Sequence, residues 1–375
     1  MKNIPLILAT VLVLVSCSTK KTSESQTLKD ALAGKFYIGT AMNLDQIYGR
    51  DTAGVRVIKQ QFNAIVAENC MKSMHIEPEQ GKFTFADADK FVEFGEKNGM
   101  FITGHCLVWH NQAPAWFFTD KNGADVSRDT LLARMKTYIT TVVSRYKGKV
   151  KGWDVLNEAL NDDGTWRDTK FYTIIGKDFV DSAFVWAAAA DPAAELYYND
   201  FGLAQQPKRA AVVELIKHLK NKGIRIDAIG MQGHCGLNYP DFAEATKSAE
   251  AFAAEGVKVM ITELDQSVLP HPNKNQGAEI TDTFAYKKAM NPFPDGLPTN
   301  IDSLWTARYV EMFRIFLQHK NIITRVTTWG TSDKHTWRNN WPIPGRTDYP
   351  LLFDRNYQPK AVVGKIIALA DSIIN

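Results

Sequence analysis

The sequence KGWDVLNE, residues 151–158, predicts a short buried strand that ends in an amide and a carboxylate, Asn157 and Glu158. A second stretch, KVMITELD at residues 258–265, repeats this pattern and places Glu263 where the apolar run ends. Short apolar runs of this kind are typical of strands that are buried on both faces. Two carboxylates at the ends of two such strands can therefore face each other across one cleft.

Outward from these two stretches, short apolar segments alternate with longer segments of helical period. The predicted strands are residues 36–43, 64–69, 101–109, 152–158, 194–200, 227–234, 258–265 and 325–333. The predicted helices are residues 87–98, 128–146, 171–190, 208–222, 241–255, 303–319 and 359–374. Gly99, Gly148, Gly223 and Gly256 follow four of these helices, where a left-handed cap favours glycine. Eight strand–helix repeats predict a (β/α)8 TIM barrel, an α/β fold. The alternative is a doubly wound open sheet, but no GxGxxG loop follows a strand.

Composition describes a soluble globular protein. The chain has 375 residues, of which 45% are hydrophobic and 23% are charged. A net charge of +3 is too small to indicate a nucleic-acid partner. No Pro-rich or Gly-rich linker divides the chain, so we expect one catalytic domain over residues 31–375 and, by default, a monomer. The one long connection, residues 266–302, follows the seventh strand, where a loop of this length is more often functional than disordered.

The N-terminus has the pattern of an export signal. A basic start at Lys2 is followed by an apolar run over residues 4–15, which is shorter than the roughly 20 residues that span a bilayer. The sequence LVSC at residues 14–17 resembles a bacterial lipoprotein signal, which implies removal of residues 1–16 and lipidation of Cys17. Residues 17–30 are then a flexible tether to the membrane of the cell envelope, its face unspecified. An ordinary signal peptide with an incidental cysteine is the alternative.

Three further cysteines, Cys70, Cys106 and Cys235, are expected to be buried free thiols, although Cys70 and Cys106 fall at similar heights on neighbouring strands and a disulfide is conceivable. The sequence shows no CxxC pair and no His-rich ligand spacing. We therefore predict no catalytic metal and no cofactor.

Polar and Trp side chains recur at the C-terminal ends of the predicted strands, which is where the catalytic groups of TIM barrels lie. They are Glu68, Asn69, Lys72, His105, Trp109, His110, Gln112, Asn157, Glu158, Asn199, Asp200, Gln232, His234, Glu263, Asp265, Trp329, Asp333 and Trp337. Gathered at one rim, the Trp side chains fit stacking on the apolar face of a sugar ring.

Hydrolysis of a glycosidic bond with retention needs one protonated and one ionised carboxyl group, about 5 Å apart. Trp153 and Trp166 flank Glu158 in sequence, which favours a dry setting for the acid. A hydrogen-bonded chain of Glu263, His234 and Asp265 could keep Glu263 ionised. Asn157 could bond the sugar 2-hydroxyl. A lone Glu at a strand end would more often form an ion pair, but two at equivalent strand ends favour catalysis.

The complete set of motifs resembles glycoside hydrolase family 10, the endo-β-1,4-xylanases, from about Phe36 to the C-terminus. The motifs are AENCMK (67–72), GHCLVWHNQAPAW (104–116), WDVLNE (153–158), YND (198–200), GMQGH (230–234), ITELD (261–265), WGTSDKHTW (329–337) and PLLFD (350–354).

The resemblance implies that Glu158 is the acid/base, that Glu263 is the nucleophile and that Asp265 supports the histidine behind it. It also implies that two sugar subsites on the glycone side of the scissile bond, which bind xylan or xylo-oligosaccharides, are lined by Glu68, Asn69, Lys72, His105, Trp109, Gln112, Asn157, Gln232, His234, Trp329 and Trp337. Three positions depart from the family pattern: Cys70, Leu156 and Phe201.

Two other functions stay open at this point. The same barrel and mechanism could act on another β-1,4-glycan, such as cellulose or mixed-linkage glucan. The chain could also be a non-catalytic xylan-binding lipoprotein, although both Glu residues are present. A serine hydrolase is disfavoured because the sequence has no GxSxG elbow.

Overall fold

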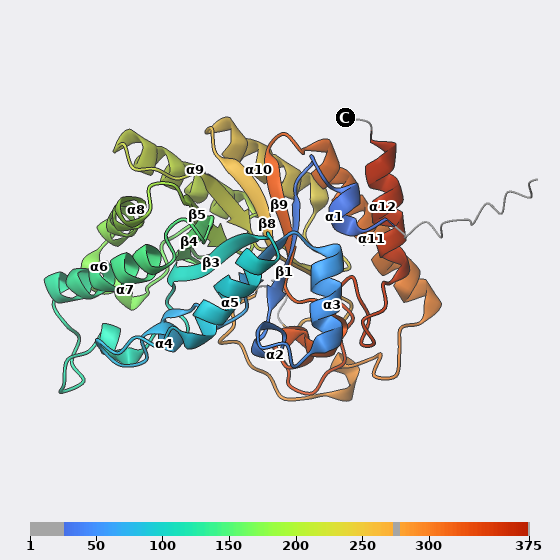
Figure 1. Ribbon diagram of the computed structural model, residues 1–375, viewed down its shortest axis with the longest axis horizontal. Helices are drawn as coiled ribbons and strands as arrows, with labels where there is room; N and C mark the ends of the chain where they lie inside the picture. Colours follow the sequence, from blue (N-terminus) through green and yellow to red (C-terminus); the bar gives the residue numbers. More distant parts are fainter. Residues whose placement is uncertain (1–25, 273–277, 374–375) are drawn as a thin grey trace, which may run out of the picture.

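A closed barrel of parallel strands forms the centre of the protein (Figure 1). The computed structural model describes residues 26–272 and 278–373. The barrel strands are β1 (Tyr37–Met42), β2 (Ala64–Ala67), β3 (Phe101–Val108), β4 (Gly152–Asn157), β5 (Glu195–Asp200), β6 (Ala228–Met231), β8 (Lys258–Ser267) and β9 (Ile323–Thr328). Each pairs in parallel with the next, and β9 closes the barrel on β1. The predicted (β/α)8 fold is confirmed.

The sixth strand is interrupted where it reaches the rim. The predicted strand 227–234 consists of β6 and of β7 (His234–Gly236), with Gln232 and Gly233 between them. Both pieces pair with β8, and the second pairing sets His234 directly beside Asp265. Gly233 has a φ of 82°, a backbone conformation that favours glycine. The interruption thus turns the chain and leaves the Gln232 side chain at the rim.

Helices surround the barrel. They are α1 (Leu28–Ala31), α2 (Leu44–Ile47), α3 (Thr52–Gln61), α4 (Ser73–Ile76), α5 (Ala86–Lys97), α6 (Arg128–Arg145), α7 (Lys170–Ile175), α8 (Asp178–Ala190), α9 (Gln206–Asn221), α10 (Phe242–Ala254), α11 (Thr299–Gln318) and α12 (Ala361–Ser372). The helix predicted over residues 171–190 is two helices, because Gly176 caps α7 with a positive φ. The four glycines predicted to follow helices all have positive φ values.

Two differences from the predicted boundaries concern how the chain packs on the barrel. Strand β9 ends at Thr328, and Asp333 begins a short 3-10 helix, η3 (Asp333–His335), where its buried carboxylate forms an ion pair with Lys360. The folded domain also begins before residue 31. Helix α1 buries Leu28 and lies beside α12 (Figure 1), so residues 28–30 belong to the barrel and not to a tether. The remaining tether up to residue 25, the signal segment and Cys17 lie outside the described residues.

The core shows why two glycines occur in the strands. A Cβ atom on Gly104 would lie 2.1 Å from the Trp153 ring, and one on Gly152 would lie 2.0 Å from the Tyr197 hydroxyl. Trp153 is fully buried beside Tyr146 of the helical layer, with ring centroids 6.4 Å apart. Cys70, Cys106 and Cys235 are free thiols and all are buried. Within the described residues, no helix is long and apolar enough to cross a membrane.

Candidate active site

A cleft of about 230 Å³ opens at the C-terminal ends of the strands. It brings together every side chain that the sequence predicted for catalysis or substrate binding: Glu68, Asn69, Lys72, His105, Trp109, Gln112, Asn157, Glu158, Gln232, His234, Glu263, Trp329 and Trp337. Asp265 lies behind this surface and is fully buried. Ala278 and Ile280, from the long loop after β8, also line the cleft and were not predicted.

The register of the strands positions the carboxylates of Glu158 and Glu263 in the cleft. Asn157 of β4 pairs with Asn199 of β5, so that the Glu158 amide donates to the Asn199 carbonyl at 2.9 Å. On the other side of β6, the Glu263 amide donates to the Gln232 carbonyl at 2.7 Å. Glu158 has a φ of 54°, which is uncommon for a residue other than glycine and is typical of strained functional positions.

Glu158 lies in a dry environment with neutral hydrogen-bond donors. Its side chain receives hydrogen bonds from Trp109 Nε1 at 2.8 Å and from Gln232 Nε2 at 2.9 Å. Burial raises the pKa of Glu158, and the negative charge of Asp200 raises it further, so that it reaches about 7 despite these donors. The environment is dry as expected, but Trp109 provides the contact. Trp153 and Trp166 pack instead among helical side chains.

Glu263 is as deeply buried but has charged partners. Asn199 Nδ2 donates to Oε1 at 2.7 Å, and His234 Nε2 lies 3.2 Å from Oε2. Burial alone would raise the pKa of Glu263, but the hydrogen bond from His234 and the charges of His105 and His234 bring it below its ordinary value. Glu263 is therefore ionised at a pH at which Glu158 is still partly protonated.

Asp265 completes the support behind Glu263. Its Oδ2 lies 3.1 Å from His234 Nδ1 and accepts a hydrogen bond from Trp337 Nε1 at 2.7 Å. Arg338 Nη2 donates to Oδ1 at 2.9 Å. Burial lowers the pKa of His234, but the charge of Asp265 and the contacts with both carboxylates outweigh it and raise the pKa to about 9. The predicted Glu263–His234–Asp265 contacts are present, with a protonated His234 as the link.

The rest of the cleft carries polar groups beside aromatic faces. Lys72 Nζ donates to Asn69 Oδ1 at 2.9 Å and lies 4.9 Å from the centre of the Trp109 ring. His105 Nδ1 lies 2.9 Å from Asp154 Oδ2, and its ring meets Trp329 edge-on at 5.3 Å. The Asn157 amide contacts the Asn199 amide at 2.8 Å. Charged donors beside aromatic rings in one cleft suit a ligand with hydroxyl groups and apolar ring faces.

Comparison with known proteins agrees with this geometry. The family model described as glycosyl hydrolase family 10 matches residues 27–369. This chain belongs to glycosyl hydrolase family 10. Among its relatives, endo-1,4-beta-xylanase A of Xylanibacter ruminicola is 50% identical over 92% of this chain and 93% of its own length. The endo-1,4-beta-xylanase of Geobacillus stearothermophilus is 40% identical over 92% of this chain and 99% of its own.

Solved structures agree as well. A family 10 endoxylanase retrieved from a sugarcane soil metagenome superposes with a TM-score of 0.89 and is 42% identical, covering 91% of this chain and 99% of its own. Xylanase XynB of Paenibacillus barcinonensis has a TM-score of 0.83 and 35% identity, covering 92% of this chain and 99% of its own. The match therefore extends over the whole barrel and both carboxylate-bearing strands.

Two supporting residues of this family 10 chain were missed by sequence reasoning. Arg338 immediately follows the predicted Trp337, but its side chain lies at Asp265 only because η4 (Trp337–Asn339) turns it inward. Asp200 was placed at the rim without a role. It is fully buried, forms an ion pair with Lys208 at 2.8 Å, and raises the pKa of Glu158. The spacing of residues along the sequence predicts neither the Arg338–Asp265 contact nor the Asp200–Lys208 contact.

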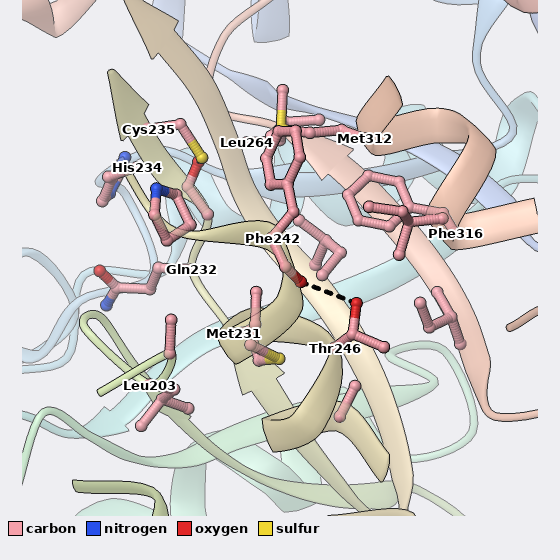
Figure 2. Close-up of a pocket in the computed structure, with 18 of the residues that line it drawn as sticks. Leu203, Met231, Gln232, His234, Cys235, Phe242, Thr246, Leu264, Met312 and Phe316 are labelled. Atoms are coloured by element: carbon pink, nitrogen blue, oxygen red, sulfur yellow. Dashed lines mark hydrogen bonds between the residues drawn. The ribbon is translucent and has the colours of Figure 1, made fainter. Parts of the chain in front are cut away.

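A second cavity lies behind the same strands and differs in character from the cleft. It measures about 80 Å³ and lies between β6, β8, α10 and α11. Figure 2 shows Met231, Leu264, Phe242, Met312 and Phe316 around it, with Gln232 and His234 at its edge. Apolar side chains dominate this cavity, so it is not the site of hydrolysis. Among the described residues, no cluster of His, Cys, Asp or Glu could hold a metal ion.

Proposed function

We propose that this protein is an endo-1,4-β-xylanase that cleaves internal bonds of xylan with retention, with Glu158 as acid/base and Glu263 as nucleophile. The observation that carries the proposal is the contrast between two buried carboxyl groups in one cleft, since neutral donors contact Glu158 and a histidine contacts Glu263. The pKa of Glu158 is raised to about 7 by burial and by Asp200, whereas that of Glu263 is lowered by its histidine partners against the effect of burial. Family membership and the names of the relatives support xylan as the substrate.

The reaction has two displacement steps. In the first, Glu263 attacks the anomeric carbon while Glu158 donates its proton to the leaving oxygen, and a glycosyl ester forms on Glu263. In the second, Glu158, now ionised, removes a proton from water, and the resulting hydroxide displaces Glu263. Each step inverts the anomeric carbon, so the product has the configuration of the substrate.

The surrounding residues bind the sugars on the glycone side. Lys72, Glu68 and Asn69 provide charged and amide groups for hydroxyls, and Trp109, Trp329 and Trp337 provide ring surfaces. Asn157 lies between Glu158 and Asn199, where its amide can bond the sugar 2-hydroxyl during the reaction. His105, Gln112, Gln232 and His234 complete the polar lining.

We also propose export and attachment to the cell envelope through a lipid on Cys17, supported by the LVSC sequence after an apolar run. Residues 18–25 would then separate the anchor from the barrel. Since one chain supplies the whole cleft, we propose a monomer. Mass spectrometry of the mature N-terminus tests the anchor. A mature chain without lipid that begins elsewhere would contradict it.

Product analysis tests the activity. Purified protein is incubated with arabinoxylan and with xylohexaose, and the first anomer released is identified by NMR. We expect short xylo-oligosaccharides that appear first as the β-anomer. Carboxymethyl cellulose serves as the comparison substrate, because preferential hydrolysis of it would assign the protein to another β-1,4-glycan. Absence of hydrolysis on every substrate by folded protein would favour a binding role.

A further inference from the structure

One segment of the long loop after β8, residues 278–281, crosses the cleft. Ala278 is buried in a small cluster with Phe201, which follows β5, and Trp341, which follows β9. Glu279 forms an ion pair at 2.5 Å with Arg167, which follows β4. In a barrel of eight strands the loops after β4 and β9 lie opposite each other. The segment therefore connects the two walls.

The two ends of the cleft differ. Beyond Glu68, Asn69 and Gln112 the cleft continues into an open groove of about 810 Å³, which is also lined by Asn43, Arg50, His75 and His335. At the opposite end lie Arg167, Phe201 and the 278–281 segment, with Ile280 facing the cleft. If Glu68 and Asn69 bind the glycone, the segment stands over the path of the leaving group.

Glu279 is the main polar attachment of this segment. Besides Arg167, its carboxylate accepts hydrogen bonds from Asn111 Nδ2 at 3.4 Å and from Thr281 Oγ1 at 3.2 Å. The side chains of Arg167 and Glu279 are 18% and 23% exposed, so the pair is only partly screened by solvent. Arg167 is itself held by the carbonyls of Glu158 at 3.1 Å and of Leu160 at 3.4 Å.

We propose that Glu279, through its ion pair with Arg167, holds residues 278–281 across the leaving-group end of the cleft and so favours short xylo-oligosaccharides over long xylan chains. The inference rests on the proposed function, because it assumes that the Glu158–Glu263 pair cleaves xylosidic bonds. A long chain must displace the segment to extend past the scissile bond. A substrate with a short leaving group does not need to displace it.

The test compares Glu279→Gln and Glu279→Ala with the parent protein on two substrates. Soluble long-chain xylan extends into the leaving-group end, whereas 4-nitrophenyl β-xylobioside has no sugar there. The ratio of kcat/KM on xylan to kcat/KM on the aryl xylobioside should rise about five-fold in Glu279→Gln, since one partly exposed ion pair contributes about 1 kcal/mol. The gain should come mainly from a lower KM for xylan. Glu279→Ala should give a larger ratio, because it also loses Asn111.

Glu250→Gln is the matched control, since it removes an exposed carboxylate that contacts His319 on the helical layer, and its ratio should equal that of the parent. An unchanged ratio in both Glu279 variants, with normal thermal unfolding, would overturn the inference. A parallel loss on both substrates would also overturn it, because Glu279 would then act on the catalytic centre through Arg167. If the parent protein itself cleaves neither substrate, the proposed function fails instead, which is a separate result.

Discussion

The surroundings of Glu158 and of Glu263 differ although the two side chains look alike. Both side chains are buried, with residue exposures of 4% and 5%, and both line one cleft, Glu158 directly after β4 and Glu263 within β8. Glu158 meets an indole and an amide, with the Asp200 charge nearby, whereas Glu263 meets a protonated His234 and the Asn199 amide. Burial alone would raise both pKa values, so the different partners are what separate the pKa of Glu158 from that of Glu263.

The largest effect is expected when Glu263, the proposed nucleophile, is replaced. Glu263→Ala should lower kcat by at least about 10⁴-fold, since no covalent intermediate can form. Azide should restore part of the activity and give a glycosyl azide of inverted configuration, which NMR detects. Full activity without azide would contradict the role of Glu263. Glu250→Gln, far from the cleft, should keep parental activity.

Removal of the acid should have a smaller effect that depends on the leaving group. Glu158→Gln should lower kcat/KM on xylo-oligosaccharides by about 10²- to 10⁴-fold, the range of general acid catalysis. An aryl xylobioside with an acidic phenol as leaving group should lose much less in the first step, because it needs little protonation. Pre-steady-state release of the phenol measures this step. Equal losses on both substrates would exclude Glu158 as the acid.

The dependence of kcat/KM on pH tests the difference in pKa between Glu158 and Glu263. Activity needs Glu263 ionised and Glu158 protonated, so kcat/KM should be bell-shaped, with a basic limb that falls as pH rises through about 7. In His234→Gln the cation beside Glu263 is lost, so the pKa of Glu263 should rise and the acidic limb should move to higher pH. The basic limb should move much less. His218→Gln, which removes a histidine on α9 beside Asp181, should leave both limbs in place.

The smallest effect is expected when the negative charge of Asp200, near Glu158, is removed. Asp200→Asn removes a negative charge that raises the pKa of Glu158, so the basic limb should move to lower pH by about half a unit. Lys208 loses its buried partner in this variant, so its thermal unfolding must be measured beside the profile. A lower unfolding temperature with an unmoved limb would assign Asp200 a purely structural role.

Much of the site could be predicted because parallel strands bring their C-terminal ends to one rim. Glu68, His105, Glu158, Gln232 and Glu263 lie within or directly after five different strands, so a barrel places them together whatever their separation in the chain. The interruption between β6 and β7 was not predicted, because it is only two residues long, Gln232 and Gly233, and the segments on either side read as one short strand. The role of Leu28 was also missed, because Leu28, Ala31 and Leu32 keep the helical spacing over only one turn, which is too short to give a clear periodic signal.

By itself, the sequence determined the barrel, its strand order and the meeting of Glu158 and Glu263 in one cleft, because these depend on local periodicity and on the regular geometry of strand–helix repeats. Only the tertiary structure decided the electrostatics. The contacts of Arg338 with Asp265, of Asp200 with Lys208 and of Glu279 with Arg167 join segments that are distant or differently oriented in the chain. Their energies depend on distance and on burial, and neither quantity can be read from spacing along a sequence.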